Sequence, residues 1–129
     1  MDLSTLAISQ NEFKMAIRHP ATREVILDDD GKEMFIGVLS SDTQVAKKEL
    51  TAFKRAVREA GKDVTEEKLH ELKCKFLSKI TTSCNMVFDK KAVKFSCDNI
   101  YNIIVKPDFS WLADDLMRTT DARGNFMQS

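Results

Sequence analysis

Residues Thr65–Val87, TEEKLHELKCKFLSKITTSCNMV, are the stretch around which this chain is organised. Its apolar residues recur at intervals of three and four positions, which places them in one stripe on an α-helix: Leu69, Leu72, Phe76, Ile80, Cys84 and Val87. The other face carries glutamates near its start and lysines further along. We therefore predict one long helix over Thr65–Val87, packed on one side and facing solvent on the other.

Length and charge predict one domain with no strong attraction to polyanions. The 129 residues suffice to bury most of the apolar surface without disulfides. The 20 basic and 20 acidic residues cancel, which disfavours nucleic acid or an anionic membrane as a partner. Residues 47–79 hold 10 basic against 6 acidic residues, and we interpret this surplus as solvated helix faces rather than a nucleic-acid footprint.

Cysteine usage predicts a reducing compartment. The three cysteines, Cys74, Cys84 and Cys97, form no CxxC pair. The N-terminus lacks a basic segment followed by an apolar run, and no apolar stretch approaches the roughly 20 residues of a membrane span. We therefore expect a soluble, intracellular protein.

Three strands are predicted before residue 40. Apolar and polar residues alternate over Phe13–Ile17, and two further extended segments follow at Glu24–Leu27 and Glu33–Leu39. Asp28–Gly31 reads as the turn between the last two. Three short strands cannot bury two faces alone, so helices must cover at least one face.

Three more helices are predicted around the long one. The first begins at the capping sequence Ser41–Gln44 and ends at Gly61, which makes it an antiparallel neighbour of the long helix. A small helix carries Ile100, Ile103 and Ile104, and a last one runs through Trp111–Met117.

The expected fold class is therefore α+β: a small N-terminal antiparallel β-sheet of about three strands, followed by a mainly helical C-terminal part of about four helices. We expect a single domain over 1–129, with a sheet part over 1–40, a helical part over 41–120 and a polar tail over 121–129.

No catalytic motif is recognisable, so we expect no enzyme, no catalytic residues and no cofactor. The four glycines form no GxGxxG, P-loop or GxSxG pattern. Asp114 and Asp115 are adjacent and point to different sides of a helix, which disfavours a paired acid–base site.

Two sequence patterns have some features of metal sites. An EF-hand register through Gly31 would place Ile26 and Gly37 at ligand positions that neither can fill, so Asp28–Gly31 is better explained as a hairpin turn. His70 and Cys74 are spaced as two zinc ligands on a helix, but no further ligand has a recognised spacing. We expect no metal.

Two aromatic residues near the C-terminus stand apart. Trp111 is expected to pack in the core against Ile100 and Ile104, with exposure as the alternative. Phe126 either anchors the tail to the body or serves as a hook for a partner, and the sequence leaves both open.

Six short motifs carry a resemblance that covers most of the chain. They are Ile17–Thr22 after the opening strand, the acidic turn Asp28–Gly31, Ser41–Asp42 at a helix start, Val93–Asn99 before a short helix, Trp111, and Arg123–Phe126 at the end. In this order the chain resembles the small tail assembly chaperones of long-tailed, siphovirus-like bacteriophages and prophages.

The resemblance implies a protein of the host cytoplasm that is not part of the mature virion. Such a chaperone binds the long helical tape measure protein, keeps it soluble and brings tail tube protein subunits to it. Its partners would be proteins, including other copies of itself, rather than a membrane.

A chaperone of this kind needs exposed apolar surface rather than a catalytic pocket. Phe35 and Leu39 are left over on the second face of the sheet, and together with Trp111 and Phe126 they are the candidate partner-binding residues. Two other functions stay open: a structural minor tail or head–tail joining protein of the virion, and a small nucleic-acid-binding regulator that uses the basic residues in 47–79.

Overall fold

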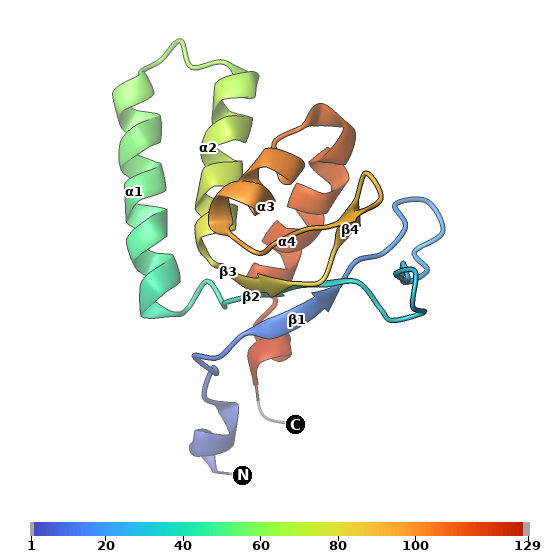
Figure 1. The fold of residues 1–129 in the computed structure, drawn as a ribbon. Helices are drawn as coiled ribbons and strands as arrows, with labels where there is room; N and C mark the ends of the chain where they lie inside the picture. Colours follow the sequence, from blue (N-terminus) through green and yellow to red (C-terminus); the bar gives the residue numbers. More distant parts are fainter. Residues whose placement is uncertain (1, 128–129) are drawn as a thin grey trace.

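The computed structural model describes residues 2–127, and its centre is a three-stranded antiparallel sheet (Figure 1). Strand β2 lies in the middle and pairs with β1 and β3. The bounds of these strands are Phe13–Ala16 for β1, Phe35–Val38 for β2 and Thr81–Cys84 for β3. The prediction of an α+β fold with a small sheet is therefore confirmed.

The register of the sheet separates an apolar face from a polar one. Met15 pairs with Ile36, and Phe13 pairs with Val38, so these side chains share one face. Ile36 and Val38 are fully buried there. The opposite face carries Lys14 beside Gly37 and does not pack against the hydrophobic core.

The predicted strand at Glu24–Leu27 is not a strand of the sheet. Residues Glu24–Leu27 form only isolated bridges, between Arg18 and Val25 and between Leu27 and Glu33, so this segment is a bridged loop. The partner of β2 is instead β3, which lies inside the stretch predicted as one long helix.

The long helix is therefore shorter than predicted. Helix α2 spans Glu66–Lys79, Ile80 is its C-cap, and β3 begins at the next residue. Cys84 lies on that strand, and Val87 lies in β4 (Val87–Phe88). Their helical spacing is coincidental, because the chain leaves the helix at the β-branched Thr81, which pairs with Val38 of β2.

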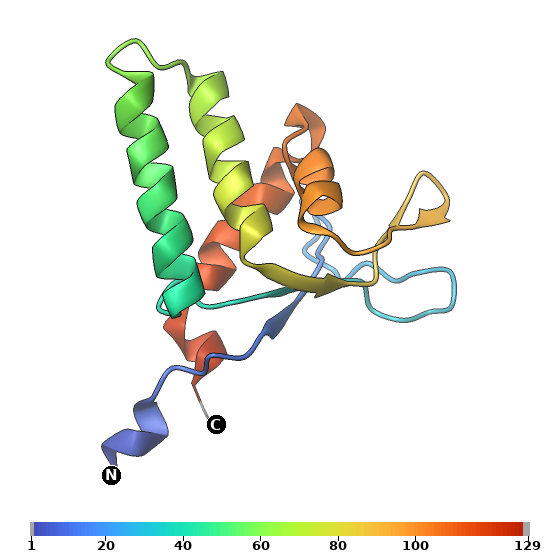
Figure 2. The ribbon, with the colours of Figure 1, turned by 60° about the vertical axis from the view of Figure 1, so that its left-hand side comes forward.

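Helix α1 spans Gln44–Ala60 and forms an antiparallel hairpin with α2, as predicted (Figures 1 and 2). Its N-cap is Thr43, whose side chain accepts a hydrogen bond from the Ala46 N–H over 3.2 Å. Its C-cap is Gly61, which has a positive φ of 82°. Ala46 is the only residue of α1 that is fully covered, so α1 is an outer helix.

The remaining elements close the core over α2. Helices α3 and α4 pack against α2, and between them they bury Ile100, Ile104 and Leu116. Their bounds and those of the smaller elements are Cys97–Ile104 for α3, Ser110–Asp121 for α4, Lys91–Ala92 for β5, and three 3₁₀ helices, η1 (Leu3–Leu6), η2 (Pro107–Phe109) and η3 (Arg123–Phe126).

The predicted polar tail is tied to the body. Phe126 is 2% exposed, and its ring meets that of Phe13 edge-on at a centroid distance of 5.8 Å. The Ser9 N–H donates to the Phe126 carbonyl over 2.6 Å. Of the two alternatives, the structure shows the anchor; residues 128 and 129 of the tail lie outside the described part.

Across residues 2–127, none of the helices has both the length and the apolarity that crossing a bilayer requires.

Candidate functional site

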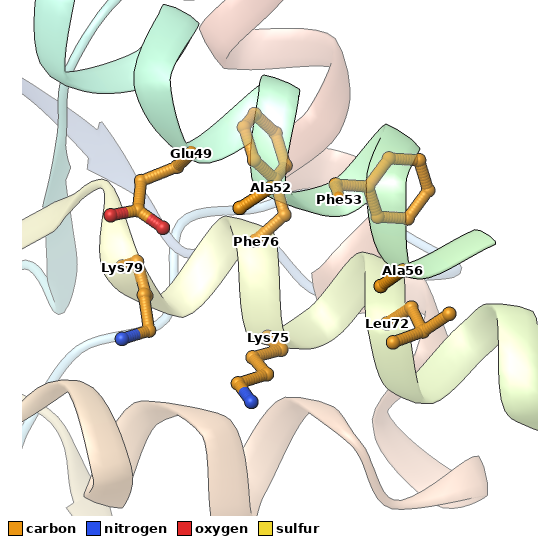
Figure 3. A pocket seen from close by; sticks show the side chains of 8 residues that line it. All are labelled: Glu49, Ala52, Phe53, Ala56, Leu72, Lys75, Phe76 and Lys79. Carbon is orange, nitrogen blue, oxygen red and sulfur yellow. The ribbon is translucent and has the colours of Figure 1, made fainter. Parts of the chain in front are cut away.

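A hollow with apolar and charged lining residues lies between α1 and α2, and we call it the hairpin groove (Figure 3). It encloses about 260 Å³. Helix α1 contributes four of its side chains and α2 the other four: Glu49, Ala52, Phe53, Ala56, Leu72, Lys75, Phe76 and Lys79.

The groove follows from the sizes of the residues that face each other. The rings of Phe53 and Phe76 meet at a centroid distance of 6.1 Å and hold the helices together. Ala52 and Ala56 present only methyl groups on the same side of α1, so the space opposite Leu72 stays open. Small residues opposite large ones therefore leave a hollow with an apolar floor.

The rim of the groove is charged. Lys75 and Lys79 are exposed and stand one turn apart on α2, while Glu49 stands on α1 (Figure 3). Within residues 2–127, neither lysine forms an ion pair. Both ammonium groups are therefore available to an anionic group that enters the groove.

The same two lysines border a second hollow, of about 310 Å³, on the other side of α2. It lies between α2 and α3, where Asp98 and Tyr101 belong to its lining. Lys75 and Lys79 thus form a cationic ridge between two hollows.

Trp111 borders a different hollow, of about 500 Å³, where the loop after β1 meets α4. Asp115 of α4 is 7% exposed and forms ion pairs with Arg23, over 3.3 Å, and with Arg118. Arg23 has a positive φ of 65°. The ion pair between Arg23 and Asp115 therefore connects this loop to α4.

The motif Ile17–Thr22 builds the turn that carries Arg23. His19 Nδ1 accepts hydrogen bonds from the N–H groups of Ala21, over 3.1 Å, and Thr22, over 3.2 Å. The Arg23 N–H donates to the His19 carbonyl over 2.9 Å. The histidine and proline of this motif therefore shape a tight turn rather than a reactive group.

The four predicted partner-binding residues lie in different parts of the structure. Phe35 is half-buried on the polar face of the sheet, where Lys14 Nζ stands 4.9 Å from its ring centre. Leu39 and Trp111 are half-buried and pack against the core, and Phe126 is buried. No hollow described above joins any two of them, so they do not form one site.

His70 and Cys74 are close together on α2 and both contact α3. His70 Nε2 lies 3.1 Å from the Val105 carbonyl oxygen, and Cys74 Sγ lies 3.5 Å from that of Ile104. Burial raises the pKa of the Cys74 thiol to about 11. In the described part of the chain, no group of three His, Cys, Asp or Glu residues is arranged to hold a metal ion.

The hairpin groove could be predicted only in part. The antiparallel pairing of the two helices followed from the short connection after Gly61. The signal for the hollow was Ala52 and Ala56 one turn apart on α1, but its meaning depends on which side of α1 faces α2.

Comparison of the chain with family models, curated proteins and solved structures found no match.

Proposed function

We propose that this chain is a phage tail assembly chaperone that holds helical segments of the tape measure protein in its hairpin groove. The observation that carries the proposal is the groove itself: an open apolar floor between two helices with unpaired lysines on its rim. The resemblance of the sequence to tail assembly chaperones supplies the identity of the client.

A helix fits this kind of surface. In helix-in-groove recognition, an amphipathic helix lays its apolar stripe into a groove between helices and keeps its polar face in solvent. The floor formed by Phe53, Leu72 and Phe76 would take the apolar stripe of the client. Lys75 and Lys79 would pair with acidic residues beside that stripe, so the preferred client segment is an acidic amphipathic helix.

The rest of the role is proposed with it. A tape measure protein exposes long apolar stripes before the tail tube encloses it, and covering them keeps the protein soluble. The chaperone would bring tail tube subunits to the covered client in the host cytoplasm and would be released before the virion matures.

The test is co-expression with the tape measure protein encoded downstream. We expect a soluble complex that co-purifies with this chain and an insoluble tape measure protein without it. As a control, Leu27→Ser changes an exposed side chain outside the groove and should leave the complex intact. A tape measure protein that is equally insoluble with the chain would contradict the proposal.

Two further observations separate the other functions. Detection of the chain in purified virions would favour a structural tail protein. DNA binding that falls steeply with salt concentration would favour a nucleic-acid regulator, because release of counterions dominates such binding.

A further inference from the structure

The N-terminal segment Asp2–Ala7, which we call the arm, carries the most exposed large apolar side chain of the described chain. Leu3 is 81% exposed and Leu6 is 43% exposed. They are three positions apart in the 3₁₀ helix η1, where side chains at this interval lie on the same edge. The arm thus presents one two-leucine edge to solvent.

The arm is held in a defined conformation. The Asp2 carboxylate accepts a hydrogen bond from the Ser4 N–H over 3.0 Å, and the Thr5 hydroxyl donates to the Asp2 carbonyl over 2.8 Å. The Ala7 N–H donates to the Ser4 carbonyl over 3.3 Å. Because these bonds already order the backbone, a partner that buries the leucines has little further ordering cost to offset.

The root of the arm is fixed away from its own hairpin groove. Ile8 bridges to Met127, and the Ser9 N–H donates to the Phe126 carbonyl. In Figures 1 and 2, η1 projects from the end of the molecule where the C-terminal segment lies and stands clear of the helices. Its leucine edge is therefore exposed to solvent and lies away from the groove of the same molecule.

We propose that the arm of one copy docks in the hairpin groove of a second copy. The groove, of about 260 Å³, is larger than the cavity of about 150 Å³ that holds a benzene ring in an engineered protein, so it can take both leucines. Its floor is apolar, and its rim carries Lys75 and Lys79 against the single acid Glu49, so its net positive charge complements the acidic Asp2 that precedes Leu3.

This inference concerns the chain alone and does not depend on the identity of the client. A client helix and the arm of a neighbouring copy would bind the same apolar surface of the groove, so each would exclude the other. Association of the free chaperone would then protect its apolar surfaces until a client displaces the arm.

The test is sedimentation velocity of the full chain from low micromolar to several hundred micromolar concentration. Leu3→Ser/Leu6→Ser removes the leucine edge, and Ala52→Trp fills the groove from an exposed position on α1. We expect the wild type and the control Leu27→Ser to associate as concentration rises, and both test variants to remain monomeric. Circular dichroism checks that each variant is folded.

Mixing the two test variants is the sharper experiment. The first retains an intact groove and the second an intact arm, so together they should form a 1:1 complex that neither forms alone. A wild type that stays monomeric over the whole range, or a leucine variant that associates like the wild type, would overturn the inference.

A charge-reversed variant covers the case in which Ala52→Trp does not fold. Lys75→Glu/Lys79→Glu alters only exposed side chains and should weaken the association at least tenfold, because the rim would then repel Asp2. Unchanged association in this variant and in the leucine variant would count against the docking mode. Neither result bears on solubilisation of the tape measure protein, which is measured separately.

Discussion

Gly37 of β2 lies directly beneath the carboxylate of Glu12 on the polar face of the sheet. A Cβ atom at this position would overlap oxygen atoms of Glu12, Ser83 and Thr82. The Ser83 hydroxyl donates to the Glu12 carboxylate over 2.8 Å, and the Thr82 hydroxyl donates to the same oxygen. The absence of a side chain at Gly37 therefore lets Glu12 join β3 across the middle strand.

Gly37→Ala should lower the free energy of unfolding by about 1–2 kcal/mol, because the new methyl group displaces Glu12 and crowds two short side chains. Urea unfolding followed by circular dichroism measures this change. Gly124→Ala is the matched control, since a Cβ there meets no atom within 4 Å, and its effect should stay within about 0.5 kcal/mol. Equal effects at the two glycines would contradict this description of the sheet.

The same cluster predicts a pH dependence. Hydrogen bonds from Thr82 and Ser83 hold the pKa of Glu12 below its usual range. The ionised Glu12 therefore stabilises the fold above about pH 4.3, the pKa of an unfolded glutamate, and this contribution is lost as the pH falls through the lower pKa of the folded state. NMR titration of the Glu12 carboxyl carbon should show the lowered pKa.

The double variant Thr82→Ala/Ser83→Ala should return the pKa of Glu12 toward about 4.3, because neither hydroxyl is left to stabilise the carboxylate. If Glu12 titrates at the same pH in the wild type and in this variant, the hydrogen bonds are not the cause of its shift.

At the scale of elements, the start of α1 is the joint between the sheet and the helical hairpin. The buried Thr43 donates from Oγ1 to the Ser40 carbonyl over 2.8 Å and accepts from the Ala46 N–H. Thr43→Ala should cost about 1–2 kcal/mol of stability, since it removes the cap and leaves buried groups without a partner. Thr43→Ser keeps the hydroxyl and should cost clearly less; urea unfolding followed by circular dichroism measures both changes.

The elements also show what could be predicted and what could not. Local periodicity and capping predicted the three helices α1, α3 and α4, the antiparallel hairpin of α1 with α2, and two of the three sheet strands. The end of α2 did not, because Ile80, Cys84 and Val87 continue the helical interval while the chain turns into a strand. Pairing with β2, more than 40 positions earlier, decides that segment, and such long-range pairing leaves little trace in local sequence.

The candidate site was harder to predict than the fold for a related reason. Of the four candidates, Phe35 and Leu39 have no evident partner in the sequence, Trp111 is expected to pack in the core with exposure as the alternative, and Phe126 is either an anchor or a hook. Tertiary packing then gave partners to three of them, and Lys14 covers Phe35. The hairpin groove depends on how two helices are rotated against each other, which two amphipathic patterns alone do not fix.

At the scale of the whole molecule, α1 and the arm lie outside a core that the sheet, α3 and α4 form with α2 (Figures 1 and 2). The outer helix α1 contacts the body through α2, so one side of the groove is built from an element that little else holds. Such an element can adjust to a bound helix at a lower cost than a core helix can. The architecture thus places the proposed docking surface beside an element that can adjust to a partner.

The central claim is that the hairpin groove binds the client, and the most direct measurement is fluorescence anisotropy with labelled peptides that tile the tape measure protein. We expect at least one acidic amphipathic peptide to bind the wild type and the Leu27→Ser control alike. Ala52→Trp should weaken that binding at least tenfold, because the indole fills the groove. Equal binding to Ala52→Trp, or no binding of any peptide to the wild type, would contradict the claim.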